Sequence, residues 1–101
     1  MPRKHRPHTP DGRYLVSKGV LKRCTDPTLD DTTRRQQLKI LMQSRMAGER
    51  EAALAAKNAL GEAGPVWWND GAPDVSGLAP EQTTYANWWA SLTTQERASG
   101  L

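Results

Sequence analysis

Residues 13–24, RYLVSKGVLKRC, decide the fold class, because they are the only strand-like part of the chain. Residues 14–16 form one short β-prone run, and residues 20–21 begin a second one. The Gly-containing turn at residues 17–19 lies between them, which is typical of a β-hairpin. A two-stranded hairpin is marginal alone in water. We therefore expect it to pack on a helix or to pair with another chain.

The segment before the hairpin, MPRKHRPHTP at residues 1–10, shows no hydrophobic periodicity. Its prolines fix φ and remove backbone donors, which disfavours both helix and strand. Its Lys and Arg residues give it a local positive charge. We expect residues 1–12 to form a disordered basic arm.

Residues 31–60 are strongly helix-prone, and Asp30 or Asp31 can cap the start of this helix. Apolar residues recur along one side of it. They are Leu38, Met42 and Met46 at i, i+4 and i+8, with Ile40 and Leu41 beside them.

Gly48 interrupts this helical pattern, at a cost of about 1 kcal/mol in a helix interior. The pattern then resumes with Ala53, Ala56 and Leu60 on a face of small residues, which lets another backbone approach closely. The sequence predicts one long helix bent near Gly48, or two consecutive helices.

Residues 61–79 are rich in Gly and Pro and predict a loop. Trp67 and Trp68 stand in its middle, within GPVWWNDGAPD at residues 64–74. Burying a large ring is the simplest way to fix a loop that has no regular backbone ladder, and adjacent side chains rarely point the same way. We expect one ring to pack against the later Trp88/Trp89 pair and the other to stay partly exposed.

Residues 80–92 predict a second, amphipathic helix, with Pro80 in its first turn. Tyr85, Trp88, Trp89 and Leu92 form its apolar stripe at i, i+3, i+4 and i+7. Thr93 and Glu96 have the spacing of a capping box, so residues 93–101 predict a short turn or a frayed tail.

The predicted fold class is therefore α+β, mainly α. It comprises an N-terminal β-hairpin, one long or broken helix, a Trp-bearing loop and a second amphipathic helix. We expect a single small domain over residues 13–92, with the helices packed antiparallel and the loop folded back over them.

Three blocks of the sequence, taken together, resemble a family of small uncharacterised bacterial proteins. They are PDGRYLV at 10–16, AAKNALGEAGPVWWNDGAPD at 55–74 and TTYANWWASL at 83–92. The resemblance covers residues 10–92 and implies a shared fold. It implies no activity, since that family has no established function. The chain departs from the family pattern by being shorter between Met46 and Glu51 and by continuing after Leu92.

Charge is distributed unevenly along the chain. Residues 1–50 carry twelve Lys/Arg against five Asp/Glu, a balance of +7, and residues 51–101 have a balance of −4. A basic segment can neutralise phosphates and release counterions, although a basic half that packs beside an acidic half gives the same pattern. The candidate nucleic-acid-binding residues are Arg3, Lys4, Arg6, Arg13, Lys18, Lys22 and Arg23.

Catalysis and metal binding find little support in the sequence. His5 and His8 are the only side chains of a type that could serve as a base near neutral pH, and both lie in the expected disordered arm. Cys24 is the single cysteine and belongs to no nucleophile or metal-ligand motif. We predict no catalytic residue, no metal and no cofactor. The lone cysteine and the lack of a membrane-spanning segment favour a cytoplasmic protein.

Protein binding is the function that the sequence favours most. A small domain with few core residues and four tryptophans can expose some of them, and Trp and Tyr are typical interface anchors. Trp67, Trp68 and Tyr14 are the candidate protein-binding residues. We expect a small non-catalytic accessory or adaptor protein that binds a protein partner or a second copy of itself. The alternatives are a protein that binds RNA or DNA through its basic N-terminal half, and an enzyme whose site shows no recognisable motif.

Overall fold

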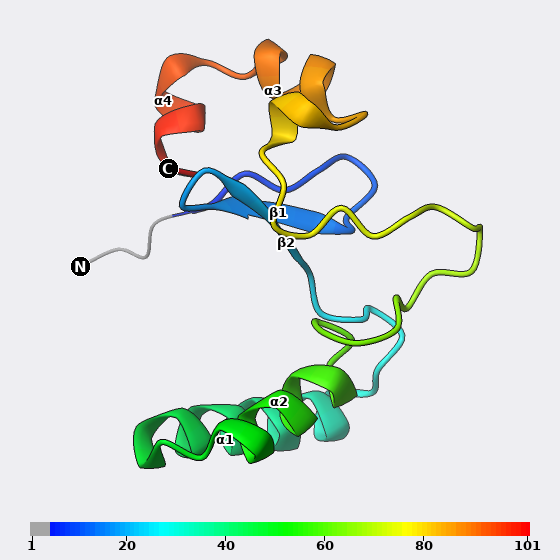
Figure 1. Cartoon of the computed structure of the whole chain (residues 1–101), viewed down its shortest axis with the longest axis vertical. Helices are drawn as coiled ribbons and strands as arrows, with labels where there is room; N and C mark the ends of the chain where they lie inside the picture. Colours follow the sequence, from blue (N-terminus) through cyan, green and yellow to red (C-terminus); the bar gives the residue numbers. More distant parts are fainter. Residues whose placement is uncertain (1–4) are drawn as a thin grey trace. The chain divides into compact units, whose positions relative to one another are not determined.

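The computed structural model describes residues 5–101, which divide into two compact units (Figure 1). Unit 1 contains residues 5–24 and 73–101, and unit 2 contains residues 25–72. The chain runs from unit 1 into unit 2 and back. The single domain over residues 13–92 stays a prediction. The α+β, mainly α fold class is confirmed, since the described residues form a two-stranded sheet and a majority of helical elements.

The hairpin of unit 1 forms where the sequence predicts it. Strand β1, Tyr14–Ser17, pairs antiparallel with strand β2, Val20–Arg23. The turn residues Lys18 and Gly19 have φ values of 55° and 79°. Positive φ at both central residues gives the turn a twist that matches the twist of the strands.

Residues 7–9 cover the outer edge of β1. The amide of Val16 donates to the carbonyl of Pro7 at 2.9 Å, and the amide of Thr9 donates to the carbonyl of Tyr14 at 2.9 Å. Unpaired strand edges are templates for association with other chains. Here the chain itself occupies that edge.

The organisation of residues 7–12 differs from the disordered arm that we expected. Thr9 is buried, its hydroxyl donates to Asp11 at 2.7 Å, and the amide of Gly12 donates to the Thr9 carbonyl at 2.9 Å. The prolines do not prevent this arrangement, because the bonds to β1 use the carbonyl of Pro7 and the amide of Thr9. Neither bond needs an N–H group from a proline. Residues 1–4 of the expected arm, which include Arg3 and Lys4, lie outside the described residues.

The outer edge of β2 is covered by a different part of the chain. The amide of Leu21 donates to the carbonyl of Leu78 at 2.9 Å, and the amide of Gly77 donates to the carbonyl of Leu21 at 2.8 Å. The hairpin is therefore stabilised by segments from both parts of unit 1. We expected it to need a helix or another chain, and its own flanking segments supply the backbone partners instead.

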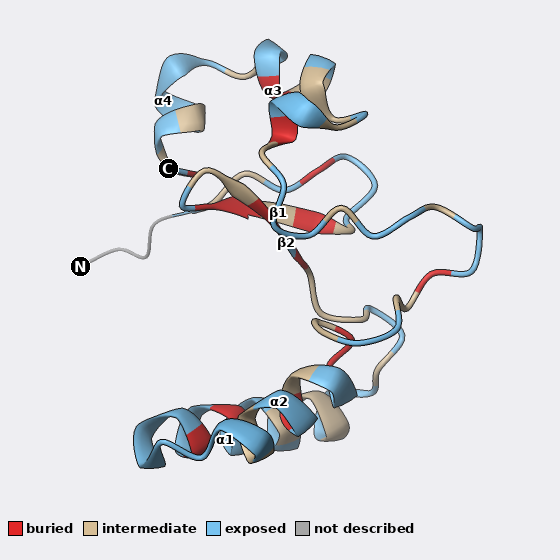
Figure 2. Cartoon of the chain, viewed as in Figure 1, coloured by how far each residue is buried: buried red, intermediate tan, exposed pale blue. Residues whose placement is uncertain are grey.

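The buried residues of unit 1 include several on the two strands of the hairpin (Figure 2). Tyr14, Val16 and Leu21 are almost completely buried, and Pro80 and Trp89 join them as buried residues. Alternating residues of a strand point to opposite faces of the sheet, so Tyr14 and Val16 share the inward side. The Tyr85 ring meets the Tyr14 ring edge to face, with centroids 5.6 Å apart, which joins the segment after residue 79 to the hairpin.

The single helix predicted over residues 80–92 is wrong in its extent. The segment forms a 3-10 turn, η1, at Pro80–Gln82 and a short helix, α3, at Ala86–Ser91. Thr83 interrupts it with an extended backbone, because its hydroxyl donates to the Pro80 carbonyl at 2.8 Å and accepts from the Tyr85 amide at 3.1 Å. Side-chain bonds of this kind compete with the helical pattern.

The C-terminal segment forms a short helix, α4, at Thr94–Ala98. The predicted capping box is confirmed, since Thr93 and Glu96 exchange side-chain and backbone bonds. Gly100 is buried, and its carbonyl accepts from the Gly19 amide at 2.9 Å. The short-turn alternative therefore describes this segment, and the frayed tail does not.

Unit 2 is built on two helices, α1 at Asp31–Ala47 and α2 at Arg50–Ala59. Of the two alternatives predicted, two consecutive helices are correct, since Gly48 adopts a φ of 72° and ends α1. Asp30 caps α1 by accepting from the Thr33 amide. None of the helices in residues 5–101 is both long and apolar enough to cross a membrane.

The two helices of unit 2 pack on each other around a small core. Leu41, Ala56 and Leu60 are its buried residues, and Leu29 and Ala53 pack against them in part. Alanine on α2 lets the helices approach closely, as expected from the small-residue face. A core of this size leaves much of each helix in contact with solvent (Figure 2).

Asp74 fastens the loop that follows unit 2 to the hairpin. Its carboxylate accepts from the Arg23 guanidinium at 2.8 Å and from the Tyr14 hydroxyl at 3.2 Å. The amide and hydroxyl of Ser76 also donate to it. Burial raises the pKa of Asp74, but the hydrogen bonds from Ser76 and Arg23 outweigh this and lower the pKa to about 2.

Replacing Asp74 by Asn should destabilise unit 1 by about 1–2 kcal/mol, because the substitution removes the negative charge beside the buried Arg23 side chain. Urea denaturation at pH 7 measures this loss. Asp70→Asn, which makes the same charge change at an exposed position of unit 2, is the matched control. Equal stability of the two variants would contradict a stabilising role for the Arg23–Asp74 pair.

The ion pair between Arg23 and Asp74 also makes the stability of unit 1 depend on pH. The pKa of Asp74 in the folded protein, about 2, lies below its usual value of 3.8. The stability it contributes is therefore fully present above about pH 4 and is lost as the pH falls through about 2. Unfolding curves across this range should fall less steeply with acid for Asp74→Asn than for the unaltered protein.

Candidate protein-binding face

The apolar side predicted for the first helix is exposed rather than buried. Leu38, Met42 and Met46 are 39%, 63% and 88% exposed, whereas the buried residues of α1 are Leu41 and Ser44. The side of α1 that packs on α2 is the side that lets the two backbones come closest. The side with Leu41 and Ser44 fits against the alanines of α2 better than the side with Leu38, Met42 and Met46. The most apolar stripe of α1 is therefore left without a partner in unit 2.

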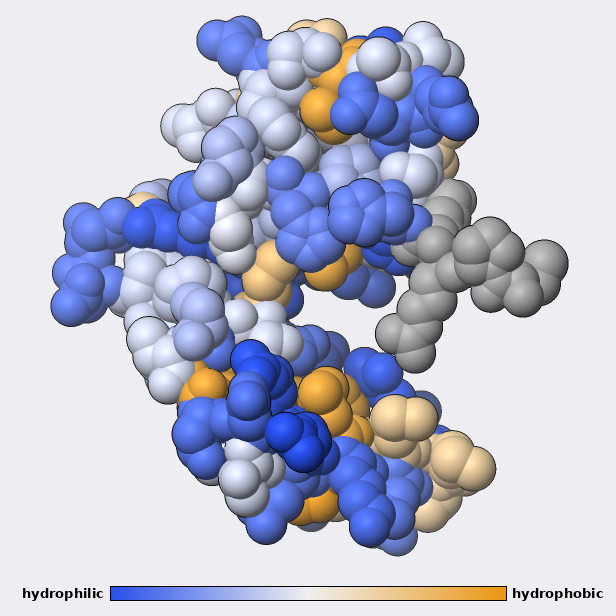
Figure 3. Space-filling view, turned by 180° about the vertical axis from the view of Figure 1, so that it is seen from behind, coloured by the Kyte–Doolittle hydropathy of each residue, from blue (hydrophilic) through white to orange (hydrophobic). Residues whose placement is uncertain are grey.

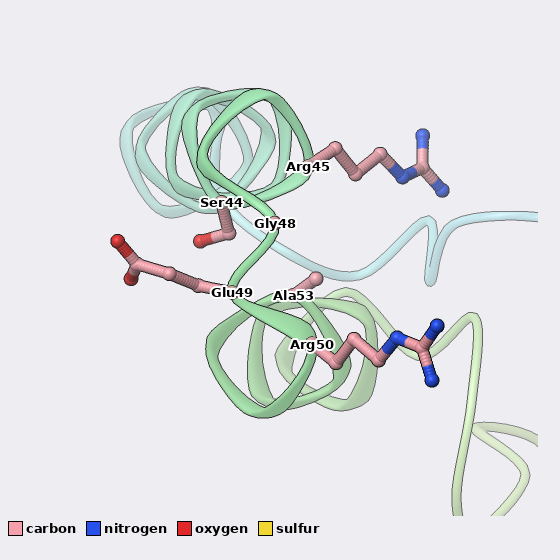
Figure 4. A pocket seen from close by; sticks show the side chains of 6 residues that line it. All are labelled: Ser44, Arg45, Gly48, Glu49, Arg50 and Ala53. Carbon is pink, nitrogen blue, oxygen red and sulfur yellow. The ribbon is translucent and has the colours of Figure 1, made fainter.

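A cavity of about 240 Å³ opens at the corner where α1 turns into α2 (Figure 4). Small-molecule and cofactor sites are typically larger, roughly 300–1,000 Å³. The corner cavity therefore suits one or two side chains better than a cofactor. Its lining residues are Ser44, Arg45, Gly48, Glu49, Arg50 and Ala53.

Arg45 and Arg50 extend to the same side of the helix pair, while Glu49 extends to the other side (Figure 4). The three side chains lie next to Gly48, whose left-handed backbone reverses the chain direction. Within residues 5–101, neither Arg45 nor Arg50 makes a side-chain hydrogen bond or an ion pair. Two cationic groups thus flank the same opening without a counter-ion from the described part of the chain.

Each arginine belongs to a line of residues along one side of its own helix, which we call a stripe. Arg45 is the last residue of the α1 stripe, and Arg50 is the first residue of the α2 stripe. On α1, Leu38, Met42 and Arg45 follow at i, i+4 and i+7, and on α2 Arg50, Ala53 and Lys57 follow at i, i+3 and i+7. Such spacings place residues on one side of a helix. Because Arg45 and Arg50 share a side, both stripes belong to one surface, which we name the basic–apolar face. Its members are Leu38, Met42, Arg45, Arg50, Ala53 and Lys57.

The surface of unit 2 is mixed in character. Hydrophobic residues lie among strongly hydrophilic ones over the part of the chain that contains α1 and α2 (Figure 3). Exposed apolar residues rimmed by polar ones are typical of protein-interaction sites. The basic–apolar face contains three cations and no carboxylate, so an anionic group is the complement of its charge.

The predicted nucleic-acid-binding residues have different environments. Lys18 and Lys22 are exposed on the hairpin, and Arg6 and Arg13 are half-buried. Arg23 is a correction, because its side chain is only 3% exposed and bonds to Asp74. A guanidinium in that position cannot meet a phosphate backbone without breaking the unit.

Tyr14 is a second correction among the predicted site residues. It is 1% exposed, and its hydroxyl donates to Asp74 and accepts from the Val75 amide. As an inward-facing residue of β1, its ring belongs to the core. It cannot anchor a partner or stack on a base.

The tryptophan pair of the loop divides as predicted in its exposure. Trp68 is buried and donates from Nε1 to the Ala72 carbonyl at 2.8 Å, while Trp67 is half-buried. The two rings meet edge to face, with centroids 5.2 Å apart. The expected packing of one ring against the Trp88/Trp89 pair joins residues of the two units and stays a prediction.

Among the groups with shifted pKa values, Asp30 and Glu96 bond to threonines at helix starts, and the others form bonded pairs in unit 1, Asp11 with Tyr85 and Asp74 with Tyr14. Burial and the Asp11 carboxylate raise the pKa of Tyr85, whose hydroxyl donates to Asp11 at 2.6 Å. Shifted pKa values are typical of catalytic sites, but they also arise from structural pairs of this kind. No group of three or more His, Cys, Asp or Glu residues is placed to hold a metal ion within residues 5–101.

No protein-family model, curated protein or solved structure matches the chain. The resemblance to a bacterial family drawn from the three sequence blocks stays a prediction. The candidate site therefore depends on the geometry of the described residues.

Sequence reasoning missed Arg45, Arg50, Ala53 and Lys57 as functional residues. The sequence did contain a pattern that points to these residues. Gly48 lies between the two arginines, and each arginine lies at the Gly48 end of an i, i+7 stripe. Once Gly48 reverses the chain, those stripes face the same way. The sequence alone left open whether the helix bends or reverses there.

Gly61 holds the start of the tryptophan loop and provides a test of its packing. Its φ is 79°, and an added Cβ would lie 2.9 Å from the Asp26 side chain and 3.0 Å from the Trp67 ring. Gly61→Ala should therefore destabilise unit 2 by about 2–4 kcal/mol through strain and overlap. Thermal or urea unfolding followed by tryptophan fluorescence measures the loss.

Gly71→Ala is the matched control for this substitution. Its φ is 82°, but an added Cβ would meet nothing within 4 Å. Gly71→Ala should lower the free energy of unfolding only through backbone strain, by about 1–2 kcal/mol. If the two variants lose equal stability, the contact of Gly61 with Asp26 and Trp67 is not what fixes the loop.

Proposed function

We propose that the chain is a small non-catalytic adaptor or accessory protein that binds another protein through its basic–apolar face. The observation that carries this proposal is the exposure of Leu38 and Met42 on the same stripe as Arg45, which lines the corner cavity of unit 2. Helices that present apolar residues at i, i+4 and i+7 are a recurring means of protein recognition.

The energetics favour burial of this face. Burying a fully exposed Leu or Met side chain contributes about 1.5–3 kcal/mol, and Leu38 and Met42 would contribute part of that because they are 39% and 63% exposed. Unit 2 has few buried apolar residues of its own, so a partner that covers Leu38 and Met42 would also enlarge its core. Small helical units commonly gain stability by association.

Trp67 supports the same proposal from another part of unit 2. It is half-buried against Trp68, so part of its ring is available to a partner. Tryptophan is enriched among residues that dominate binding energy. Of the anchors predicted from the sequence, Trp67 is the one whose environment fits that role.

Binding to RNA or DNA is the second candidate function. Lys18 and Lys22 are exposed and separated by only a few residues of the hairpin, which suits contacts to a phosphate backbone. The exposed apolar residues of unit 2 have no role in such contacts. We therefore favour protein binding.

A photo-crosslinking side chain at position 42 should capture a partner in the cells that make this protein. Met42→benzoylphenylalanine is expected to give a discrete adduct, because that position lies on the basic–apolar face. Gln43→benzoylphenylalanine, which is exposed on another side of α1, is the control. The mass of the adduct separates a second copy of the chain from a different protein.

Two results would contradict the proposal. One is the absence of any adduct from position 42 in protein that remains helical by circular dichroism. The other is equal capture from positions 42 and 43, which would show random encounters rather than a defined interface. Leu38→Ser with Met42→Ser should abolish the adducts formed from a probe placed at Lys57, another residue of the face.

A further inference from the structure

We propose that the partner presents an acidic amphipathic helix, whose carboxylates pair with Arg45 and Arg50 and whose apolar side chain enters the corner cavity. This inference rests on the proposed function and specifies the chemistry of the partner. Four features of unit 2 support it in turn: charge, apolar content, the shape of the site and the type of cation.

The first feature is the unbalanced charge of the basic–apolar face. Arg45, Arg50 and Lys57 supply three positive charges, and none of the six residues of the face is acidic. Glu49, the one carboxylate that lines the corner cavity, extends to the opposite side of the helix pair (Figure 4). Charges across an interface are normally complementary, so the matching surface is anionic.

The second feature is the apolar content of the face, which argues against a partner that offers only negative charge. Leu38 and Met42 precede Arg45 on the α1 stripe, and Ala53 lies between Arg50 and Lys57 on the α2 stripe. A phosphate backbone offers no apolar group to cover Leu38 and Met42. An acidic protein segment offers both carboxylates and apolar side chains, and it therefore matches the whole face.

The third feature is the shape of the site. The two stripes run along neighbouring antiparallel helices and meet at the corner cavity of about 240 Å³. A helix laid between two helices contacts them through residues at i, i+3, i+4 and i+7. The corner cavity then receives one apolar side chain, and the arginines on either side of it are in place for the acidic residues that flank that side chain.

The fourth feature is that both cations at the cavity are arginines. A guanidinium binds a carboxylate through two parallel hydrogen bonds, whereas an ammonium acts as a point charge. Paired bonds of this type fix the orientation of the bound segment. Arg45 and Arg50 thus determine the register of the partner helix, and Leu38 and Met42 contribute its burial.

A synthetic peptide tests the inference directly. The probe is a fluorescein-labelled helix of about 15 residues, or roughly four turns, with Leu at i, i+3, i+4 and i+7 and Glu at the flanking positions. A second peptide carries Gln in place of every Glu. Fluorescence anisotropy with the full chain at low salt should show binding of the Glu peptide and binding at least about tenfold weaker for the Gln peptide.

Substitutions in the chain then locate the contact. Arg45→Gln and Arg50→Gln should each weaken binding of the Glu peptide by about tenfold. Lys22→Gln is the matched control, since it removes the same charge from an exposed residue of unit 1 and should leave binding unchanged. Circular dichroism of each variant checks that the helices remain folded.

The outcomes separate this inference from the proposed function. Failure of the Glu peptide to bind at about 1 mM, or equal weakening by Lys22→Gln, overturns the acidic helix. Adducts from position 42 that persist in Arg45→Gln and Arg50→Gln would leave the protein-binding function standing and remove the acidic partner. Tight binding of a single-stranded oligonucleotide that depends on both arginines would replace both proposals with nucleic-acid binding.

Discussion

A two-stranded hairpin has two unpaired edges, and unit 1 depends on covering both. Residues 7–9 pair with β1, and residues 77–78 pair with β2. The second contact requires the chain to return to the sheet after the helices of unit 2. The Arg23–Asp74 ion pair holds this return in place. Because the covering segments come from the chain itself, the hairpin edges are not available for strand addition by a partner, and the exposed surface of the helices becomes the better candidate for binding.

Much of the fold follows from local signals in the sequence. Positive φ at Lys18 and Gly19 gives the hairpin turn, Gly48 ends the first helix, and the Thr93 capping box starts the last one. These features depend on a few neighbouring residues, so the sequence predicts them well. The break at Thr83 was missed because hydrophobic spacing favoured a continuous helix, whereas the Thr83 hydroxyl bonds to the backbone of Pro80 and Tyr85.

The candidate site was less predictable, because it depends on which sides of two helices meet. The stripe of Leu38, Met42 and Met46 is the most apolar side of α1, yet the Leu41 side packs against α2. Hydrophobic periodicity identifies an amphipathic helix without naming its neighbour. Tyr14 and Arg23 were misassigned for a related reason, since the strand pattern that makes the hairpin recognisable also turns both side chains toward the core. Residue type alone suggested surface chemistry for them.

The interruption of unit 1 by unit 2 imposes an order on folding during synthesis. The contacts of unit 2 are local in sequence, so α1 and α2 can close on each other soon after they leave the ribosome. The sheet cannot be completed at that stage, because its later residues have not yet been synthesised. Asp74, which bonds to Arg23, comes 51 residues later, and residues 77 and 78, which bond to Leu21, follow it. In that interval the edge of β2 is open to neighbouring nascent chains. The short length of β2 and its exposed Lys22 limit aggregation until the return segment arrives.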